Sequence, residues 1–317
     1  MAVALSEWVR LIETEYLGEF IAGGGSAVKL IVTPDVEGIN VSLAHVAGIA
    51  DTQGYLVAWV DAALTKVQMI DQLFYAVARQ VDWEAGLCVW LREQFVQNGY
   101  HPPEENPFAD MDALAASGNN DRAGLMAEVR RWIRQELITD YSLVKEFRVA
   151  MSLLAWRQIN PQTVTPNDAE LVRGWLRGER VALPALKQVQ IFGRIDRNNA
   201  RFLLASLTAF LPRLGYRGLV LLLDISPVVS DVAPATGALR YSRAAAQDCY
   251  EVLRQFIDAT DEMRHLLLVA AAGPGLIDNA SRGLDSYTAL KLRTSDEVRD
   301  QNRANPLGTM VRLDTTL

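Results

Sequence analysis

Four short, continuously apolar runs constrain the fold of this chain most strongly. They are Lys29–Val32, Tyr55–Val60, Gly218–Asp224 and Leu266–Ala271. Each run has the length of a strand, and continuous rather than alternating apolarity is typical of strands that are buried on both faces of a parallel sheet. Helical patterns separate the runs, so the sequence predicts an α/β fold.

The connections between these predicted strands differ greatly in length. One helix-length segment separates the first two, whereas residues 61–217 separate the second from the third. Almost all of this long stretch has helical periodicity. We therefore expect a single domain over residues 1–317, with residues 62–195 forming a large, mainly helical insertion between the second and third strands. A last strand is expected at Met310–Leu313.

Local signals within the long stretch support the helical interpretation. Thr165 followed by Pro166 predicts a helix start, because Thr is a favoured N-cap and Pro is favoured at the first helical position. Gly178 predicts the end of that helix. Apolar residues from Phe202 to Leu214 recur at helical spacing, which predicts a second helix there.

The charge balance limits the classes of partner. The chain has 31 Lys and Arg against 38 Asp and Glu, a net charge of −7. This acidic balance argues against a broadly basic nucleic-acid-binding surface, although it leaves room for a local basic patch. With 50% hydrophobic and 22% charged residues, the composition is that of a globular protein and excludes disorder as the dominant state.

The cysteines and histidines do not form a metal-binding pattern. Cys88 and Cys249 lie far apart and form no CxxC pair, and His45, His101 and His265 have no ligand-like spacing. We therefore expect neither a disulfide framework nor a metal site.

The chain shows no targeting or membrane signal. The first 20 residues lack a basic segment followed by an apolar one, and no apolar run approaches 18 residues. The expected location is the cytoplasm, without membrane association.

The segment after the first predicted strand occupies the place of a phosphate-binding P-loop. That chemistry needs glycines for close backbone approach, a Lys for the β- and γ-phosphates, and a Ser or Thr hydroxyl for Mg²⁺. Residues 33–42 read TPDVEGINVS, in which only Gly38 keeps its place. The third strand ends in Asp224 and so has the form of a Walker B strand, a weak signal when taken alone.

Several short motifs, each modest alone, occur together in a fairly specific order and spacing. They are Tyr16-Leu17, Gly23-Gly24-Gly25, Trp175-Leu176-Arg177-Gly178-Glu179, Asn199-Ala200-Arg201, Leu214-Gly215-Tyr216-Arg217-Gly218-Leu219, Arg282-Gly283-Leu284, Ser286-Tyr287-Thr288-Ala289-Leu290 and Asn305-Pro306. With these motifs, the chain resembles the ATP-binding P-loop proteins of BREX-type bacterial antiphage systems. That family is AAA+-like and is related in architecture to origin-recognition ATPases. The resemblance implies a P-loop NTPase sheet and a place in a bacterial defence complex.

The chain departs from this family at the nucleotide site. The family's P-loop resembles GxxGxGKT, and here Thr33, Val36 and Gly38 stand at its glycines, Ile39 at its lysine and Asn40 at its threonine.

Two other family positions have changed as well. The family's Walker B motif ends in Asp-Glu, whereas this chain has Asp224-Ile225. Ile225 removes the acid that would polarise the attacking water. Gly273 stands where the fourth strand of the family ends in a polar, sensor-like Thr.

The changes in the P-loop affect binding and metal coordination separately. Ile39 removes the cation that offsets phosphate charge, and Asn40 removes the hydroxyl ligand for Mg²⁺. Asp35 and Glu37 place negative charges where phosphates would lie. Val36 disfavours the positive φ that a phosphate-binding turn requires. One compensating substitution cannot restore all of these functions.

Two further features have both a structural and a functional interpretation. Gly23–Gly25 is expected to be a turn leading into a strand, and the alternative is a phosphate contact. Arg194, Arg197 and Arg201 are expected to lie on a solvated helix face, and the alternatives are an arginine finger or a nucleic-acid contact.

The leading functional hypothesis is a degenerate AAA+-like pseudo-ATPase that acts as a structural or regulatory subunit of a bacterial defence complex. No cofactor is expected, including ATP and Mg²⁺. The expected partners are other subunits of the complex, either an active ATPase or further copies of this chain.

Two alternatives stay open. Gly38 and Asp224 allow a switch that binds nucleotide without hydrolysing it. Analogy with origin-recognition ATPases allows a DNA-binding adaptor, which the acidic balance disfavours. The chain ends soon after the last predicted strand, so we expect the small helical lid of AAA+ proteins to be absent.

Overall fold

A computed structural model describes residues 2–231, 237–295 and 304–315 of the chain. The chain divides into two compact units: residues 1–80 together with 216–317, and residues 81–215. The first unit contains a six-stranded sheet in the order β1-β6-β2-β5-β4-β3, and every paired neighbour runs parallel. The α/β class and the parallel sheet predicted from the sequence are therefore confirmed.

The strands agree closely with the apolar runs in the sequence. Their bounds are β1 Val3–Ala4, β2 Ser26–Val32, β3 Leu56–Asp61, β4 Leu219–Asp224, β5 Leu266–Ala272 and β6 Met310–Asp314. All residues of β2 and β5 are buried, and so are the first five of β4. Continuous burial explains why apolar residues dominate both faces of these three strands instead of alternating with polar ones, with Ser26 and Lys29 as buried polar exceptions in β2.

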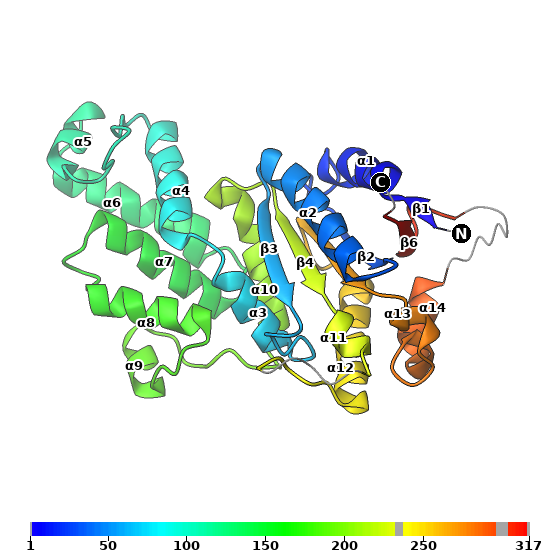
Figure 1. The fold of residues 1–317 in the computed structure, drawn as a ribbon. Coiled ribbons are helices and arrows are strands. Elements are labelled where there is room, and N and C mark those ends of the chain that lie inside the picture. Colours follow the sequence, from blue (N-terminus) through cyan, green and yellow to red (C-terminus); the bar gives the residue numbers. More distant parts are fainter. Residues whose placement is uncertain (1, 232–236, 296–303, 316–317) are drawn as a thin grey trace. The chain divides into compact units, whose positions relative to one another are not determined.

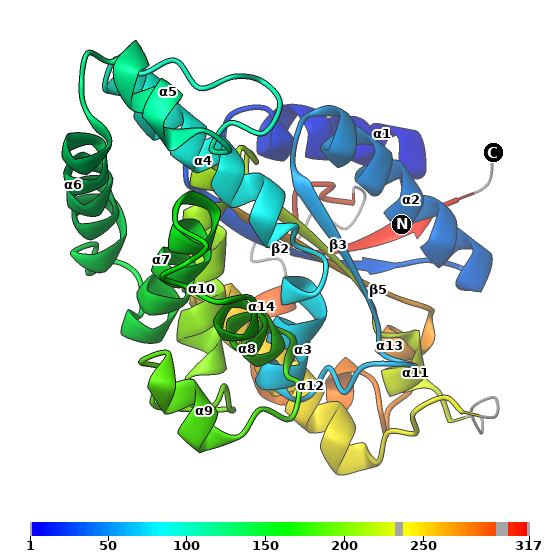
Figure 2. The ribbon, with the colours of Figure 1, turned by 90° about the vertical axis from the view of Figure 1, so that its left-hand side faces the viewer.

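One face of the sheet is covered by the helices that flank β2. These elements are α1 Leu5–Leu11, the π-helical turn η1 Ile12–Leu17 and α2 Val36–Thr52. Figure 2 shows α1 and α2 together on one side of the strands. Side chains from these helices, among them Trp8, Leu43 and Val46, form a single buried core with residues of β2, β4, β5 and β6.

The other elements of the first unit complete the sheet's cover. They are α3 Ile70–Ala78, α11 Ser226–Val229, α12 Arg243–Asp258, α13 Gly275–Asp278, the 3₁₀ turn η4 Leu284–Ser286 and α14 Thr288–Thr294. Helix α12 packs against β2 and α14, on the side of the sheet away from α1 and α2. Both faces of the sheet's centre are therefore buried, as a parallel sheet requires.

The second unit is helical throughout. Its elements are α4 Trp83–Gln97, α5 Met111–Ser117, α6 Arg122–Ile133, the π-helical turn η2 Arg134–Ile138, α7 Lys145–Ile159, α8 Pro166–Arg177, α9 Leu183–Gln188, α10 Ala200–Phe210 and the 3₁₀ turn η3 Leu211–Leu214. Figure 1 shows these helices in cyan and green. Residues 62–218 are all described, and none of them lies in a strand.

The helix signals predicted from the sequence are present in this unit. The Thr165 hydroxyl accepts a hydrogen bond from the Asp168 backbone N–H, and the Asp168 carboxylate accepts one from the backbone N–H of Thr165. This reciprocal capping box begins α8, and Gly178 ends the helix in the left-handed conformation. Phe202 and the apolar residues after it lie in α10 and η3, so the second predicted helix is also confirmed.

The expected insertion and the second unit differ in their bounds. The sequence predicts an insertion over residues 62–195, whereas the helical unit spans residues 81–215. Helix α3 belongs to the unit that contains the sheet, and α10 belongs to the helical unit. The description of the whole chain as one interrupted AAA+-like domain stays a prediction.

No membrane-spanning helix is found in the described part of the chain: each helix there is too short or too polar to cross a bilayer.

Candidate functional site

The carboxyl ends of the parallel strands define the first place to look for a site, because ligands of open α/β sheets bind outside this edge. Thr33 follows β2, Asp61 and Asp224 end β3 and β4, and Gly273 follows β5. Asp61 and Asp224 lie opposite each other in the β3–β4 register. The topology thus places at one edge of the sheet the residues that the sequence predicts as degenerate Walker A, degenerate Walker B and sensor-like positions.

The connection between β2 and α2 has only three residues, Thr33, Pro34 and Asp35. Asp35 is the N-cap of α2, and its carboxylate accepts a hydrogen bond of 2.7 Å from the Gly38 backbone N–H. An N-cap carboxylate satisfies a free N–H group and also lies at the positive end of the helix dipole. The Asp35 carboxylate, an anion of the chain itself, therefore occupies the N-terminus of α2.

Hydrogen bonds fix this short turn against the sheet. The Thr33 hydroxyl donates to the Asp35 carbonyl oxygen at 2.8 Å, and the Thr33 backbone N–H donates to the Ala272 carbonyl oxygen at 3.1 Å. Thr33 is only 1% exposed. It also lines a hollow of about 160 Å³ beside Pro274. Thr33, at the position of the family's first P-loop glycine, is therefore buried at the edge of the sheet.

Gly38 lies in close contact with the end of the chain. A Cβ atom at this position would be 2.8 Å from the Thr315 hydroxyl oxygen and 3.1 Å from the Thr33 Cβ atom. This close approach favours glycine here, whereas the backbone conformation does not, because Gly38 has no positive φ.

The other P-loop positions lie on different sides of α2. Ile39 is fully buried in the core shared with the sheet. Val36 is 62% exposed, and Asn40 is also exposed. The helix already begins at Val36, so four of the five candidate positions belong to its first turns rather than to a loop.

The end of β4 is held by a local turn. The Asp224 carboxylate accepts a hydrogen bond of 2.8 Å from the Ser226 backbone N–H. Burial raises the pKa of Asp224, and the nearby charge of Asp61 raises it further, while the hydrogen bonds from Ser226 lower it. Ile225 is fully buried, so the position of the missing Walker B acid faces the protein interior.

A cavity of about 500 Å³ lies at this edge. Val36 and Gly273 both line it, so the structure brings these two predicted site residues together. A Cβ atom added at Gly273 would meet nothing within 4 Å. The other lining residues come from the segments after β3, β4 and β5: Ala63, Ser226, Pro227, Val229, Ser230, Asp231, Ala238, Leu239, Arg240, Tyr241, Gly275 and Arg282.

Hydrogen bonds and an ion pair hold the polar wall of this cavity. Arg282 Nε lies 2.6 Å from the Asp231 carboxylate, and Arg282 Nη1 donates to the Tyr241 carbonyl oxygen at 2.8 Å. The Tyr241 hydroxyl is within 2.9 Å of the Ala62 carbonyl oxygen and 2.7 Å of the Thr65 carbonyl oxygen. Burial raises the pKa of Tyr241 to about 12, so this hydroxyl stays neutral.

The residues of the β2–α2 turn do not fit a nucleotide triphosphate in the manner of a P-loop. A P-loop uses free backbone N–H groups and a Lys to hold phosphates. Here the Asp35 carboxylate already accepts the Gly38 N–H, and Ile39 at the lysine position is buried in the core. An ATP phosphate placed at this turn would have to displace a carboxylate of the same charge sign.

Gly23–Gly25 lies at the opposite edge of the sheet, just before β2 begins. The backbone N–H groups of all three glycines donate to carbonyl oxygens within the turn, those of Glu19, Ile21 and Phe20. This confirms the expected turn.

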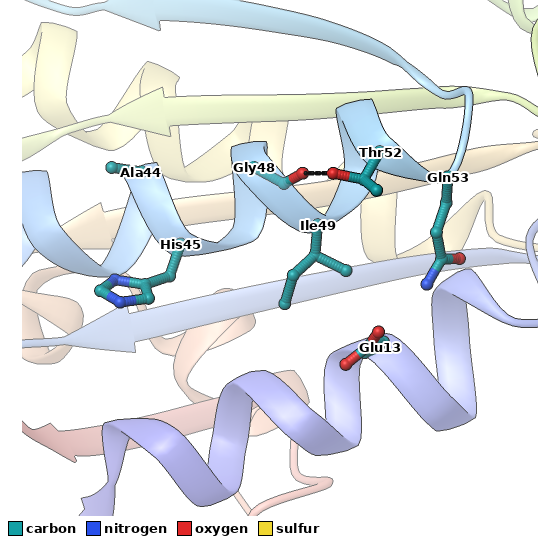
Figure 3. Close-up of a pocket in the computed structure, with 7 residues that line it drawn as sticks. All are labelled: Glu13, Ala44, His45, Gly48, Ile49, Thr52 and Gln53. Carbon is teal, nitrogen blue, oxygen red and sulfur yellow. Dashed lines mark hydrogen bonds between the residues drawn. The ribbon is translucent and has the colours of Figure 1, made fainter.

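A separate hollow of about 440 Å³ lies on the outer side of α2 (Figure 3). Figure 3 shows Ile49 and Gln53 projecting from α2 toward the helical segment that carries Glu13. His45, which also lines this hollow, donates from Nδ1 to the Val41 carbonyl oxygen at 2.8 Å. Among the described residues, no group of three or more His, Cys, Asp or Glu side chains is placed to hold a metal ion.

Comparison with known proteins identifies the family of the chain. The model of the BREX system ATP-binding protein BrxC/D family matches residues 109–316, well over half of the chain. The chain belongs to the BrxC/D family. The resemblance seen in the sequence is therefore confirmed.

The family match covers only part of the candidate site. It includes β4, β5 and β6, whereas β2 and α2 lie before its first matched residue. Membership in the BrxC/D family therefore does not depend on the segment that the sequence predicts to be a degenerate P-loop. No curated protein and no solved structure matches the chain.

Sequence reasoning missed several residues of this edge. The expectation that Asp35 acts only as a charge that repels phosphate overlooks its position just before a helical pattern, which is an N-cap signal. Asp231, Arg240 and Tyr241 form no recognisable motif, because their segment meets Arg282 only in the fold. Arg282 lies in the Arg282-Gly283-Leu284 motif, which by itself predicts no role for this side chain.

Proposed function

We propose that this BrxC/D-family chain serves the BREX phage-defence system as a pseudo-ATPase, a subunit that contributes protein contacts rather than ATP hydrolysis. Its partners would be other subunits of the system, either an active ATPase or further copies of the chain. The proposed location is the cytoplasm.

The observation that carries this proposal is the Asp35 carboxylate on the first turn of α2. It makes a 2.7 Å hydrogen bond to the Gly38 N–H, where a P-loop would present N–H groups to phosphate. Ile39 and Ile225 support the proposal, because both stand at positions of functional polar groups and both are buried in apolar surroundings. Restoring one of these groups would not restore the others.

Steady-state ATP turnover tests the proposal when it is combined with phage protection in cells. The informative variant is Asp224→Asn, which keeps a hydrogen-bond acceptor for the Ser226 N–H but removes the charge that a Walker B acid needs for Mg²⁺. We expect no turnover above background in either protein, and equal protection by both. Mg²⁺-dependent turnover that Asp224→Asn abolishes would refute the proposal.

The cavity of about 500 Å³ favours a second candidate, a switch that binds nucleotide without hydrolysing it. Its volume is in the range of small-molecule sites, and it contains the basic side chains of Arg240 and Arg282. This switch would bind nucleotide through the cavity wall rather than through the β2–α2 turn. Micromolar ATP binding that Arg282→Gln weakens and Asn40→Ala leaves unchanged would favour it over the pseudo-ATPase.

A further inference from the structure

A basic segment of the helical unit contrasts with the acidic balance of the whole chain. Residues 177–201 contain six Arg or Lys and two Asp or Glu, a net charge of +4 in a chain whose total is −7. Arg177 is taken up by ion pairs with Glu170 and Glu179. Arg180, Arg194 and Arg197 are exposed and make no ion pair with the residues that the structure describes.

Two exposed aromatic rings accompany these cations. Phe192 is 56% exposed and Phe202 is 58% exposed, although both belong to a helical unit whose other phenylalanines include the fully buried Phe95, Phe147 and Phe210. Large exposed rings leave apolar surface in contact with water, and grouped rings of this kind mark interaction sites.

Contacts around the first turn of α7 place the Phe192 ring and the backbone of Phe202 beside Lys145. The Lys145 ammonium lies 5.6 Å from the centre of the Phe192 ring. The Val144 backbone N–H, one residue earlier, donates at 2.9 Å to the Ser206 hydroxyl, which in turn donates to the Phe202 carbonyl oxygen. The Phe192 ring and the backbone of Phe202 therefore lie beside the start of α7, which packs against α8 and α10.

Hydrogen bonds tie Arg194 to the segment that carries Arg180 and to the loop before α10. Arg194 Nη2 donates at 3.4 Å to the carbonyl oxygen of Val181, the residue after Arg180. The Asn199 side chain donates to the Arg194 carbonyl oxygen at 2.9 Å, which fixes the loop that leads into α10. We call Lys145, Arg180, Phe192, Arg194, Arg197 and Phe202 the basic–aromatic surface.

The acids beside this surface do not neutralise it. Glu146 follows Lys145 and is half-buried. The Asp196 carboxylate accepts hydrogen bonds from the backbone N–H groups of Asn198 and Asn199, so it is turned into its own loop. Glu179 lies within ion-pair distance of Arg177. Four cations and two rings remain available to a polyanion.

We propose that the basic–aromatic surface binds single-stranded nucleic acid. Positive side chains follow the phosphate backbone, and exposed rings stack on unpaired bases. A duplex would offer the phosphates but not the faces of its bases, and an acidic peptide would leave both rings without stacking partners. The proposal is independent of whether the chain binds or hydrolyses ATP.

Fluorescence anisotropy of the full chain with a labelled 20-nucleotide oligothymidine tests the proposal. With four cations on phosphates, the slope of log K against log salt should be about −3, which is roughly a 50-fold loss of affinity between 50 and 200 mM salt. Phe192→Ala combined with Phe202→Ala should weaken binding by about tenfold or more without changing that slope. Both rings are exposed, so this variant should keep the circular dichroism spectrum of the parent.

Charge-matched variants separate this surface from a general charge effect. Arg194→Gln with Arg197→Gln should reduce the magnitude of the salt slope by about 1.4, since each phosphate contact contributes about 0.7. Arg130→Gln with Arg131→Gln makes the same change of charge on exposed positions of α6 and should leave the affinity nearly unchanged.

Several outcomes would overturn the proposal. They are no binding at 50 mM salt, equal weakening by the α6 control pair, no effect of removing both rings, or equally tight binding to a blunt duplex of the same length. Displacement by an equimolar poly-glutamate peptide would indicate an acidic protein partner instead. Oligouridine of the same length should bind as well as oligothymidine, because stacking and phosphate contacts do not read the sugar.

Discussion

Removing the Asp35 carboxylate is the most informative perturbation of the β2–α2 turn. In the structure this carboxylate accepts the Gly38 N–H at 2.7 Å and lies at the positive end of the 17-residue helix α2. Loss of such a cap costs about 1 kcal/mol. Loss of its charge at the helix N-terminus adds about 0.3–1 kcal/mol. Asp35→Ala should therefore weaken the first turn of α2 by about 1–2 kcal/mol, which corresponds to a factor of about 5–30 in the local opening equilibrium.

Hydrogen exchange measured by mass spectrometry is the suitable assay, because it reads local opening even though the chain contains two compact units. Amides in the first turn of α2 should exchange about 5–30 times faster in Asp35→Ala. Asp35→Asn keeps an acceptor for the Gly38 N–H and should show only the smaller charge effect. Glu37→Ala removes an equal charge from the same turn without removing the cap, and so serves as the matched control.

The comparison between Asp35 and Glu37 decides whether the capping argument is right. If Asp35→Ala and Glu37→Ala accelerate exchange equally, the carboxylate acts only through its charge and does not cap the helix. If neither variant changes exchange, the Asp35 carboxylate does not cap α2 in solution.

Three further predictions concern the first unit. Gly38→Ala should destabilise it by about 1–3 kcal/mol through the close contact with Thr315, and Thr315→Ala should remove part of that cost in a double-mutant cycle followed by thermal unfolding. Lys29→Met should speed amide hydrogen exchange in β6. The two carbonyl oxygens that the Lys29 ammonium binds would each lose their donor, and each loss costs about 1–3 kcal/mol. Hydrogen bonds and charge from Arg254 lower the pKa of Glu251 from 4.5 to about 2, so its stabilising contribution is present above pH 4.5 and is lost as the pH falls through 2. The stability of Glu251→Gln should therefore depend less on pH between 4.5 and 2 than the stability of the parent, as measured by acid unfolding. An unchanged dependence on pH would contradict the lowered pKa of Glu251.

The sheet could be predicted from the sequence because its strands are buried on both faces. Continuous apolarity gave β2, β4 and β5 to within three residues at each end. The edge strand β1 could not be predicted, because its two residues, Val3 and Ala4, are too few to form a pattern. Its position depends on pairing with β6, which lies more than 300 residues away along the chain.

The candidate site was only partly predictable. Motif comparison located the β2–α2 turn and the end of β4, because these positions are local in sequence. It could not show that Ile39 faces the core or that Thr315 covers Gly38, since those facts depend on the packing of α2 and of the chain after β6. The wall around Arg282 and Tyr241 likewise exists only through contacts between distant segments.

The basic–aromatic surface shows the same limit. The sequence drew attention to Arg194 and Arg197, and a solvated helix face was the favoured interpretation. In the structure both arginines lie in the segment between α9 and α10 rather than within a helix. The signal that was missed is the exposure of Phe192 and Phe202, which composition cannot reveal.

Titration calorimetry of the full chain with ATP, with and without Mg²⁺ at physiological salt, tests the central claim most directly. If the Asp35 carboxylate and the buried Ile39 have replaced the phosphate site, no heat of binding should appear up to millimolar ATP, with or without the metal ion. Micromolar binding that is tightened by Mg²⁺ and abolished by Asp224→Asn would contradict the claim.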